Sequence, residues 1–183
     1  MTLLRVAIAL LVCAVTVAPS GADERADRLV TAFAAICLAK PDSIAAIHKA
    51  ATAQGFAPEG SSAAALADAE VNKVDPLNLL IFWRTGFAEG RMKLTGLTGG
   101  TVERYEVGCW LDGDDVQPDA VLAALTTRLG EPTGRGTKDT LFEATWSVDK
   151  ARQAIATLRY KPGEGARRVS LSVAQVLGRA AGR

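Results

Sequence analysis

The sequence predicts a two-layer α+β domain, in which an antiparallel sheet of five to six strands carries helices on one face. Three observations support this prediction. Two apolar stripes with helical spacing form an N-terminal helical hairpin, six later segments have the apolar pattern of strands, and one more helical stripe is inserted among them. Helices and strands alternate too irregularly for a parallel βαβ fold. The hairpin and the inserted helix are therefore expected on one face of the sheet.

The first 22 residues have the features of a secretory signal peptide. A basic residue lies near the amino terminus, and Val6–Ala18 is an uncharged run of 13 residues, shorter than the ~20 that span a bilayer. Small residues precede a predicted cleavage between Ala22 and Asp23, and an uncleaved N-terminal anchor is the alternative. The mature domain is expected to span 23–178, with a frayed tail at 179–183. This predicts a periplasmic or secreted protein without a stable membrane span after cleavage.

Two helices are expected at the start of the mature chain. Asp23–Lys40 has one apolar stripe and ends before Pro41, because the residue preceding a proline is pushed out of helical geometry. Ile44–Gln54 forms the second helix and ends at Gly55. It carries His48, the only histidine of the protein, which lacks the partner residues of a metal site or a catalytic triad. We interpret His48 as a structural residue rather than a base or ligand.

The segment Phe56–Asp75 has the weakest pattern. It begins with a loop, and Ser62 is expected to cap a short Ala-rich helix over Ala63–Val71. The helix has good propensity but little apolar bulk. A mobile flap that contacts a ligand or partner is the functional interpretation of this segment.

Six strands are expected after this segment. Leu77–Arg84 is a compact apolar run, for which a strand is favoured over a short buried helix because Gly86 soon follows. A hairpin turn is expected at Thr98–Gly100, since consecutive glycines allow the positive φ angles of tight turns. The inserted helix is Asp119–Leu129, and Thr133–Asp139 is expected to be a loop. The strands are Leu77–Arg84, Gly90–Thr98, Thr101–Asp112, Leu141–Val148, Gln153–Tyr160 and Arg168–Val176.

Two cysteines remain after removal of the signal peptide, Cys37 and Cys109. An exported protein with two cysteines usually forms one disulfide. Neither residue has an adjacent histidine, a second cysteine at CxxC spacing or a basic cluster, which argues against the alternative of a reactive thiol. Cys37 lies on the apolar stripe of the first helix, and Cys109 lies on the apolar face of the strand Thr101–Asp112. A bridge between them would fasten the helices to the sheet.

Basic residues gather at the C-terminal end of the chain. Residues 23–149 hold 12 basic and 19 acidic residues, whereas residues 150–183 hold eight basic residues and one acidic residue. This segment either binds an anionic partner or, as we favour, neutralises acidic strands across the sheet. The net charge of +1 argues against general nucleic-acid binding. The candidate partner face consists of Arg152, Arg159, Lys161, Arg167 and Arg168.

Three stretches superficially resemble functional motifs, and each departs from the pattern it would need. Asp112–Asp115 lacks the alternating ligands and distal glutamate of a calcium loop. Thr133–Asp139 has neither the spacing nor the strand-to-helix order of a phosphate-binding loop. Ser147–Lys150 fits SxxK, but the companion motifs of penicillin-recognising enzymes are missing. The sequence therefore predicts no catalytic residue, no metal and no cofactor.

These observations favour an exported, non-catalytic binding or protein-interaction module. Its partner would be an unknown protein or an anionic envelope component. Contact is expected through a sheet face, the Phe56–Asp75 segment or the basic C-terminal strands. Two alternatives stay open: an accessory or inhibitor subunit of an envelope enzyme, and a hydrolase whose carboxylates or serine converge only in the fold.

Overall fold

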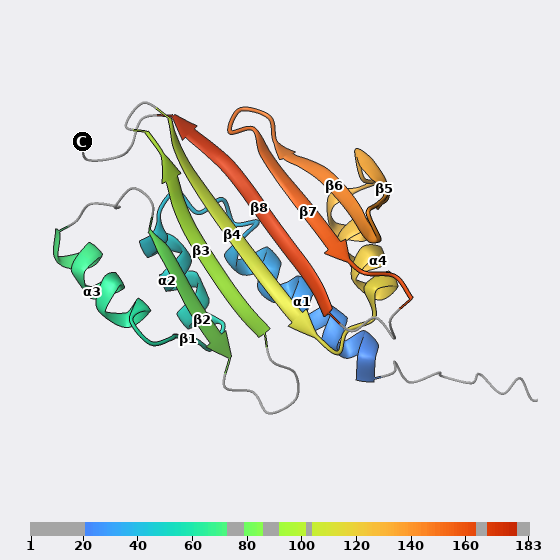
Figure 1. The fold of residues 1–183 in the computed structure, drawn as a ribbon, viewed down its shortest axis with the longest axis horizontal. Helices are drawn as coiled ribbons and strands as arrows, with labels where there is room; N and C mark the ends of the chain where they lie inside the picture. Colours follow the sequence, from blue (N-terminus) through green and yellow to red (C-terminus); the bar gives the residue numbers. More distant parts are fainter. Residues whose placement is uncertain (1–20, 73–78, 86–91, 102–103, 164–167, 179–183) are drawn as a thin grey trace, which may run out of the picture.

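The computed structural model describes residues 21–72, 79–85, 92–101, 104–163 and 168–178. These residues form four helices and one eight-stranded antiparallel sheet (Figure 1). Residues 1–20, which hold most of the predicted signal peptide, and the predicted tail at 179–183 lie outside the described residues.

The elements alternate between helices and strands in the first half of the chain and are mainly strands in the second. In chain order they are α1 (Gly21–Ile36), α2 (Ile44–Ala53), β1 (Phe56–Pro58), α3 (Ser62–Asn72), β2 (Leu80–Thr85), β3 (Met92–Gly100), β4 (Tyr105–Asp114), α4 (Pro118–Leu129), β5 (Gly134–Lys138), β6 (Leu141–Asp149), β7 (Ala154–Tyr160) and β8 (Arg168–Gly178).

The strands are ordered β1-β2-β3-β4-β8-β7-β6-β5, and every neighbouring pair is antiparallel. The sheet thus consists of two four-stranded meanders, β1–β4 and β5–β8, whose last strands pair with each other. Helix α4 carries the chain from the centre to the far edge, and β5–β8 then return strand by strand (Figure 1). Strand β8, the last strand of the described residues, therefore lies at the centre of the sheet.

The expected antiparallel α+β architecture is present, but the prediction of five to six strands was wrong. The two additional strands are the edge strands β1 and β5. Strand β1 has three residues, one of them Pro58, which is too short for an alternating pattern. In β5 all five residues are exposed, so no apolar residue marks the buried face. The segment Thr133–Asp139, expected to be a loop, contains this strand.

The predicted turn at Thr98–Gly100 was also misplaced. Strand β3 continues through Gly100, which pairs with Tyr105, so the turn follows it. The Thr98 side chain is buried, and its hydroxyl accepts a hydrogen bond from the backbone N–H of Leu79 at 3.2 Å. A threonine and two glycines have the composition of a turn, but here the hydroxyl is used inside the sheet.

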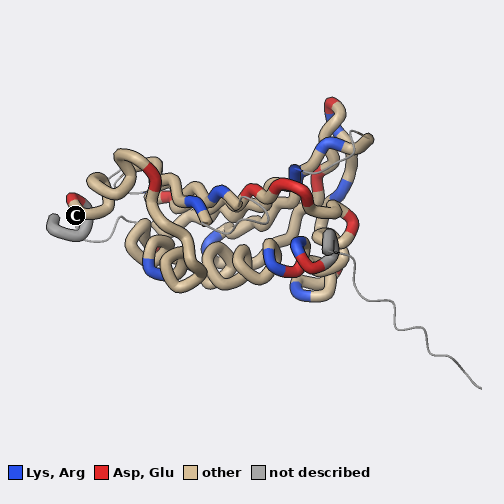
Figure 2. Tube along the Cα trace, turned by 90° about the horizontal axis from the view of Figure 1, so that it is seen from below, with Lys and Arg blue, Asp and Glu red and all other residues tan. Residues whose placement is uncertain are grey.

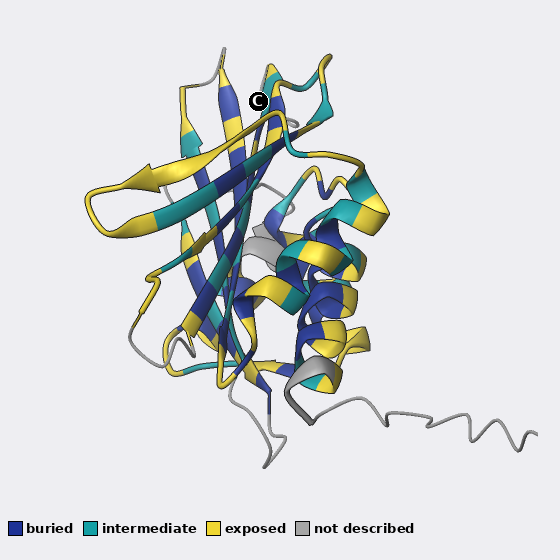
Figure 3. Ribbon diagram, turned by 90° about the vertical axis from the view of Figure 1, so that its right-hand side faces the viewer, coloured by how far each residue is buried: buried dark blue, intermediate teal, exposed yellow. Residues whose placement is uncertain are grey.

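Helices α1, α2 and α4 form one layer against one face of the sheet, while α3 lies beside β2 at the sheet's edge (Figures 1 and 2). No described helix covers the opposite face. We call this opposite face the open face. The β5–β6 hairpin, exposed over most of its length, rises from one end of the sheet on this side (Figures 2 and 3).

The core lies between this helical layer and the inward face of the sheet. On β4 the side chains of Tyr105, Val107, Cys109 and Leu111 are all at most 2% exposed, as their alternation predicted. They belong to one continuous core with the apolar stripe of α1 and with β7 and β8. Both meanders therefore share a single hydrophobic core.

The end of α1 is fastened to the centre of the sheet. Cys37 follows the last helical residue and forms a disulfide with Cys109 of β4, with their Cα atoms 5.5 Å apart and both side chains at most 2% exposed. The helix stops at Ile36, four residues before its predicted end at Lys40, which has a φ angle of 59°. This early stop lets the chain turn back across the ends of the strands.

Polar contacts hold the connection between α1 and α2 against the second meander. The buried Gln175 amide of β8 donates a hydrogen bond to the carbonyl oxygen of Pro41. The Arg152 guanidinium donates to the Lys40 carbonyl at 3.2 Å, and the Lys40 ammonium lies 2.9 Å from the Asp149 carboxylate. Strand β8 and the β6–β7 turn thus both contact the loop that follows the disulfide.

Asp149 is the centre of this polar group. Its carboxylate also accepts hydrogen bonds from the backbone N–H groups of Ala151 at 3.0 Å and Arg152 at 3.2 Å. The hydrogen bond from Lys40 is the largest cause that lowers the pKa of Asp149, followed by the backbone N–H of Arg152. These contacts favour the charged form in the folded state.

We expect removal of the disulfide to lower the free energy of unfolding by about 4 kcal/mol, because the bridge closes a loop of 72 residues and restricts the unfolded chain. The Cys37→Ala/Cys109→Ala double variant and the reduced wild-type protein should show equal losses in urea unfolding. Two thiols that react with maleimide in unreduced, folded protein would contradict the bridge.

Asp149 should contribute stability that depends on pH. Because folding lowers its pKa, the contribution is fully present above the pKa of an unfolded aspartate, about 4, and is lost as the pH falls toward the folded value. The difference in unfolding free energy between wild type and Asp149→Asn should therefore narrow below about pH 4. Lys40→Gln should remove most of the same dependence. A difference that stays constant from neutral to acidic pH would exclude this role.

Candidate functional site

The open face carries an apolar row that crosses five strands. Leu80 of β2 pairs with Leu97 of β3, Leu97 with Gly108 of β4, Gly108 with Ala174 of β8, and Ala174 with Ile155 of β7. The residues that flank these positions are buried on the helical side, apart from Leu79, which is partly buried against the core. The five positions therefore face away from the helices. Four strand spacings give the row a length of roughly 19 Å.

Trp110 fills the gap that Gly108 leaves in this row. A Cβ atom at Gly108 would overlap the six-membered ring of Trp110, so the indole lies over the glycine backbone. Trp110 itself is half-buried. We define the apolar row as Leu80, Leu97, the Trp110 ring, Ala174 and Ile155.

The large hydrophobic side chains exposed in the described residues all belong to this face. They are Leu80, Leu141 and Ile155, with exposed fractions of 47%, 45% and 50%. Leu80 and Ile155 are the two ends of the apolar row. Leu141 begins β6 and shares the open face with Glu143, two residues along the strand. Single exposed hydrophobics are ordinary, but their collection on one face indicates a contact surface.

A charged row runs parallel to the apolar row, from Lys93 of β3 to Glu143 of β6. Its ion pairs link neighbouring strands: Arg159 of β7 contacts Glu143 of β6 at 2.6 Å, and Arg168 of β8 lies 3.8 Å from Asp112 of β4. The Lys93 ammonium lies 4.5 Å from the ring centroid of Phe82. Such exposed pairs each contribute little stability. They do place carboxylates beside the C-terminal basic residues.

The structure divides the predicted basic partner face. Arg159 and Arg168 lie near one end of the sheet, and the exposed Lys161 follows β7 there. Arg152 lies roughly 20 Å away, beyond the other end of β7, where it holds the α1–α2 connection. Arg167 lies outside the described residues.

His48 has a structural contact in the helical layer. Its Nδ1 atom accepts a hydrogen bond of 3.0 Å from the indole Nε1 of Trp83, a side chain that is fully buried. The two rings stack with their centroids 6.2 Å apart. The histidine thus supplies the acceptor for a buried donor that would otherwise be unsatisfied.

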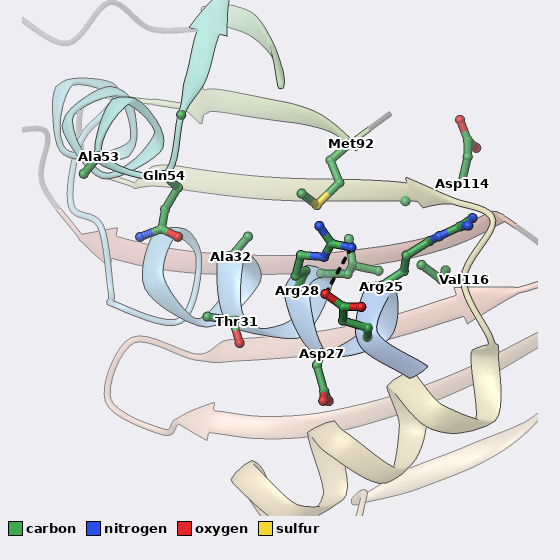
Figure 4. Close-up of a pocket in the computed structure, with 14 residues that line it drawn as sticks. Arg25, Asp27, Arg28, Thr31, Ala32, Ala53, Gln54, Met92, Asp114 and Val116 are labelled. Carbon is green, nitrogen blue, oxygen red and sulfur yellow. Dashed lines mark ion pairs between the residues drawn. The ribbon is translucent and has the colours of Figure 1, made fainter. Parts of the chain in front are cut away.

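A groove of about 560 Å³ opens on the helical side, between the first half of α1, the end of α2 and the outer ends of β3 and β4 (Figure 4). Apolar side chains such as Leu29 and Met92 lie within it. At its mouth Arg28 lies 3.5 Å from Glu24. The volume suits a small ligand, but the mouth carries a mutually paired acid and base rather than a convergent set of free polar groups.

The described residues show no grouping of three His, Cys, Asp or Glu side chains that could hold a metal ion. Within the same ranges, no helix has the length and apolar character needed to cross a membrane. The exposed large hydrophobic side chains make the open face the candidate site in the described part of the chain.

Sequence reasoning did not identify the apolar row, although one local signal was present. In β2 both faces are apolar, because Leu80 and Phe82 alternate with the buried Ile81 and Trp83. A strand with one solvated face normally alternates apolar and polar residues. The excess apolar character therefore indicated a second contact surface.

Comparisons with protein-family models, with curated proteins and with solved structures found no match to this chain.

Replacing His48 should destabilise the fold without affecting the open face. We expect His48→Ala to lower the free energy of unfolding by about 1–3 kcal/mol, because the Trp83 indole N–H loses its acceptor. His48→Gln, which can supply an amide oxygen, should lose less. Lys49→Ala, an exposed neighbour on the same helix, serves as the control in urea unfolding. Equal losses for His48→Ala and Lys49→Ala would contradict this role.

Proposed function

We propose that the mature chain is an exported, non-catalytic protein-interaction module that binds a partner protein on the open face of its sheet. The observation that carries the proposal is the position of Leu80, Leu141 and Ile155, which are about half exposed and share this face. Each would gain roughly 1 kcal/mol from removal of its remaining apolar surface from water. This gain favours a partner that covers the face.

The edges of the sheet are poorer binding surfaces than the face. Pro58 lies in the edge strand β1, and the adjoining backbone of Phe82 is already used: its N–H donates to Ser62 Oγ at 3.0 Å, and its carbonyl accepts from Glu59 N–H at 2.9 Å. The other edge strand, β5, carries Arg135 and Lys138. Proline, lysine and arginine on an edge oppose pairing with a further strand.

Export is supported by the disulfide and by the N-terminal sequence. A buried bridge between Cys37 and Cys109 suits an oxidising compartment such as the periplasm or the extracellular space. The described basic residues do not form one continuous anion-binding surface, because Arg159 and Arg168 have carboxylate neighbours. A protein partner is therefore favoured over an anionic envelope component.

The alternatives differ in what they require. An accessory or inhibitor subunit would use the same open face, with an enzyme as its partner. A hydrolase would require a pair of convergent carboxylates or an activated serine. The exposed apolar face favours the interaction module.

Site-specific photo-crosslinking in the native cells tests this proposal. A photoreactive phenylalanine analogue at position 80 or 155 should form a covalent adduct with a protein when irradiated. The same analogue at Ala123, an exposed position on α4 in the opposite layer, should form none. Mass spectrometry then identifies the adduct. Absence of protein adducts at both open-face positions, or equal yields at position 123, would refute binding through this face.

A further inference from the structure

We infer that the partner protein places an aromatic side chain over Gly136, in a hollow where the β5–β6 hairpin rises from the open face (Figure 3). This inference rests on the proposed function, because it names one contact of the same partner. The hollow has a volume of about 680 Å³. Both strands of the hairpin and Arg159 of β7 line it.

The register of the strands gives the direction in which Gly136 faces. Gly136 of β5 pairs with Glu143 of β6, and Glu143 pairs with Arg159 of β7. Paired residues of antiparallel strands share one face of the sheet. Gly136 therefore extends the charged row onto the edge strand, and a side chain at this position would point into the hollow.

The fold gives no reason for a glycine at position 136. Apart from the adjacent residues of the chain, no heavy atom lies within 4 Å of the place a Cβ atom would take, and the φ angle is not positive. Gly60, Gly130 and Gly163 also face open space, but their φ angles of 52°, 82° and 89° favour glycine. A glycine inside a strand weakens it, because glycine loses the most conformational entropy on folding and packs no side chain.

The other glycine of β5 does have a structural reason. A Cβ atom at Gly134 would lie 3.1 Å from the hydroxyl oxygen of Thr145, which is closer than ordinary contact. The same hydroxyl donates to the Gly134 carbonyl at 3.4 Å, at the base of the hairpin. Gly134 thus lets the two strands close, whereas Gly136 leaves a space that no described side chain fills.

Two common roles of a strand glycine do not account for Gly136. The pairing of β5 with β6 is continuous, so the glycine does not mark a bulge. Protection of the sheet edge is already supplied by Arg135 and Lys138, since charged side chains oppose pairing with a further strand. A third common role is the close approach of a ligand or another chain to the bare backbone.

The sheet itself shows which group covers a glycine on this face. The ring of Trp110 lies over Gly108, as described above. An aromatic ring is broad and flat, and aromatic side chains stabilise sheets by covering edge glycines. No described side chain covers Gly136 in this way. A ring supplied by the partner would complete the same arrangement at the edge.

The neighbours of Gly136 suit an aromatic ring. Lys138 lies two residues along β5 on the same side, and no ion pair engages it within the described residues. An ammonium group within about 6 Å of a ring is attracted to the ring face. The open face already contains this contact, since the Lys93 ammonium lies 4.5 Å from the Phe82 ring centroid. Leu141, paired with Lys138 and 45% exposed, adds apolar surface.

An acidic side chain would fit the hollow less well. It would attract Lys138, but it would also meet the carboxylates of Asp139 and Glu143, which line the same hollow. The charge of Arg159 is already compensated by Glu143 at 2.6 Å. An uncharged ring gains from the lysine without this repulsion.

One partner can cover both the hollow and the apolar row. From Gly136 to Ile155 the distance is two strand spacings across the sheet and four residues along β7, or roughly 17 Å. A standard protein–protein interface of about 800 Å² per partner spans this distance. Interfaces are enriched in aromatic side chains that fill such recesses.

Two variants of β5 test the reading of the glycines in purified protein. Gly136→Val should raise the Tm by about 1–4 °C, because valine favours a strand and restricts the unfolded chain. Gly134→Val should lower the Tm, because its side chain would press on Thr145. A lower Tm for Gly136→Val would show that the fold itself requires this glycine and would overturn the inference.

The same variant tests contact with the partner. With the photoreactive analogue at position 155, outside the hollow, Gly136→Val should reduce the yield of the protein adduct at least about fivefold, because valine fills the space of the ring. Ala123→Val on α4 adds the same groups in the opposite layer and should leave the yield unchanged.

A photoreactive analogue at position 141 tests the chemistry of the occupant. It should capture the same protein as position 155, through a segment that contains Trp, Tyr or Phe. Mass spectrometry of the crosslinked peptide identifies this segment. A captured segment without an aromatic residue overturns the aromatic contact.

The outcomes separate this inference from the proposed function. An adduct yield at position 155 that Gly136→Val leaves unchanged overturns the contact in the hollow, and the interaction module still stands. The same holds for an adduct at position 155 without one at position 141. Absence of protein adducts at both positions 80 and 155 overturns both proposals.

Discussion

The attachment of the first helix to the central strand is the constraint on which the other features depend. Strand β4 pairs with β3 on one side and β8 on the other, so it is where the two meanders meet. The disulfide joins this strand to the end of α1, and the amide of Gln175 on β8 holds the following loop. Helix α1 is thereby fixed across the junction, and the helical layer covers one face of the sheet. The other face is left for contacts outside the described core.

A sheet that is held in this way offers a rigid binding surface. Its side chains stand at positions set by strand spacing, and Trp110 is supported from below by the backbone of Gly108. A preorganised surface loses little conformational entropy when a partner covers it. This compensates in part for the modest area of the apolar row.

Local patterns in the sequence predicted the parts of the fold that bury one face. The alternation of Tyr105, Val107, Cys109 and Leu111 identified β4 and the side chain that forms the disulfide. Strand β5 has only exposed residues, so periodicity carried no information about it. The apolar row arises from the register of five strands, and the pairing of β4 with β8 joins distant parts of the chain. Such non-local pairing is not encoded in the spacing of neighbouring residues, which is why the row was not predicted.

The central position of β8, the last strand of the described residues, has a consequence for biogenesis. A chain that emerges amino terminus first can complete β1–β4 long before β8 is available. Until then, β4 has an unpaired edge, which is a template for pairing with another nascent chain. The nascent chain is therefore most prone to aggregation in the interval before β8 is available. Chaperones that bind extended apolar segments would protect it during this interval.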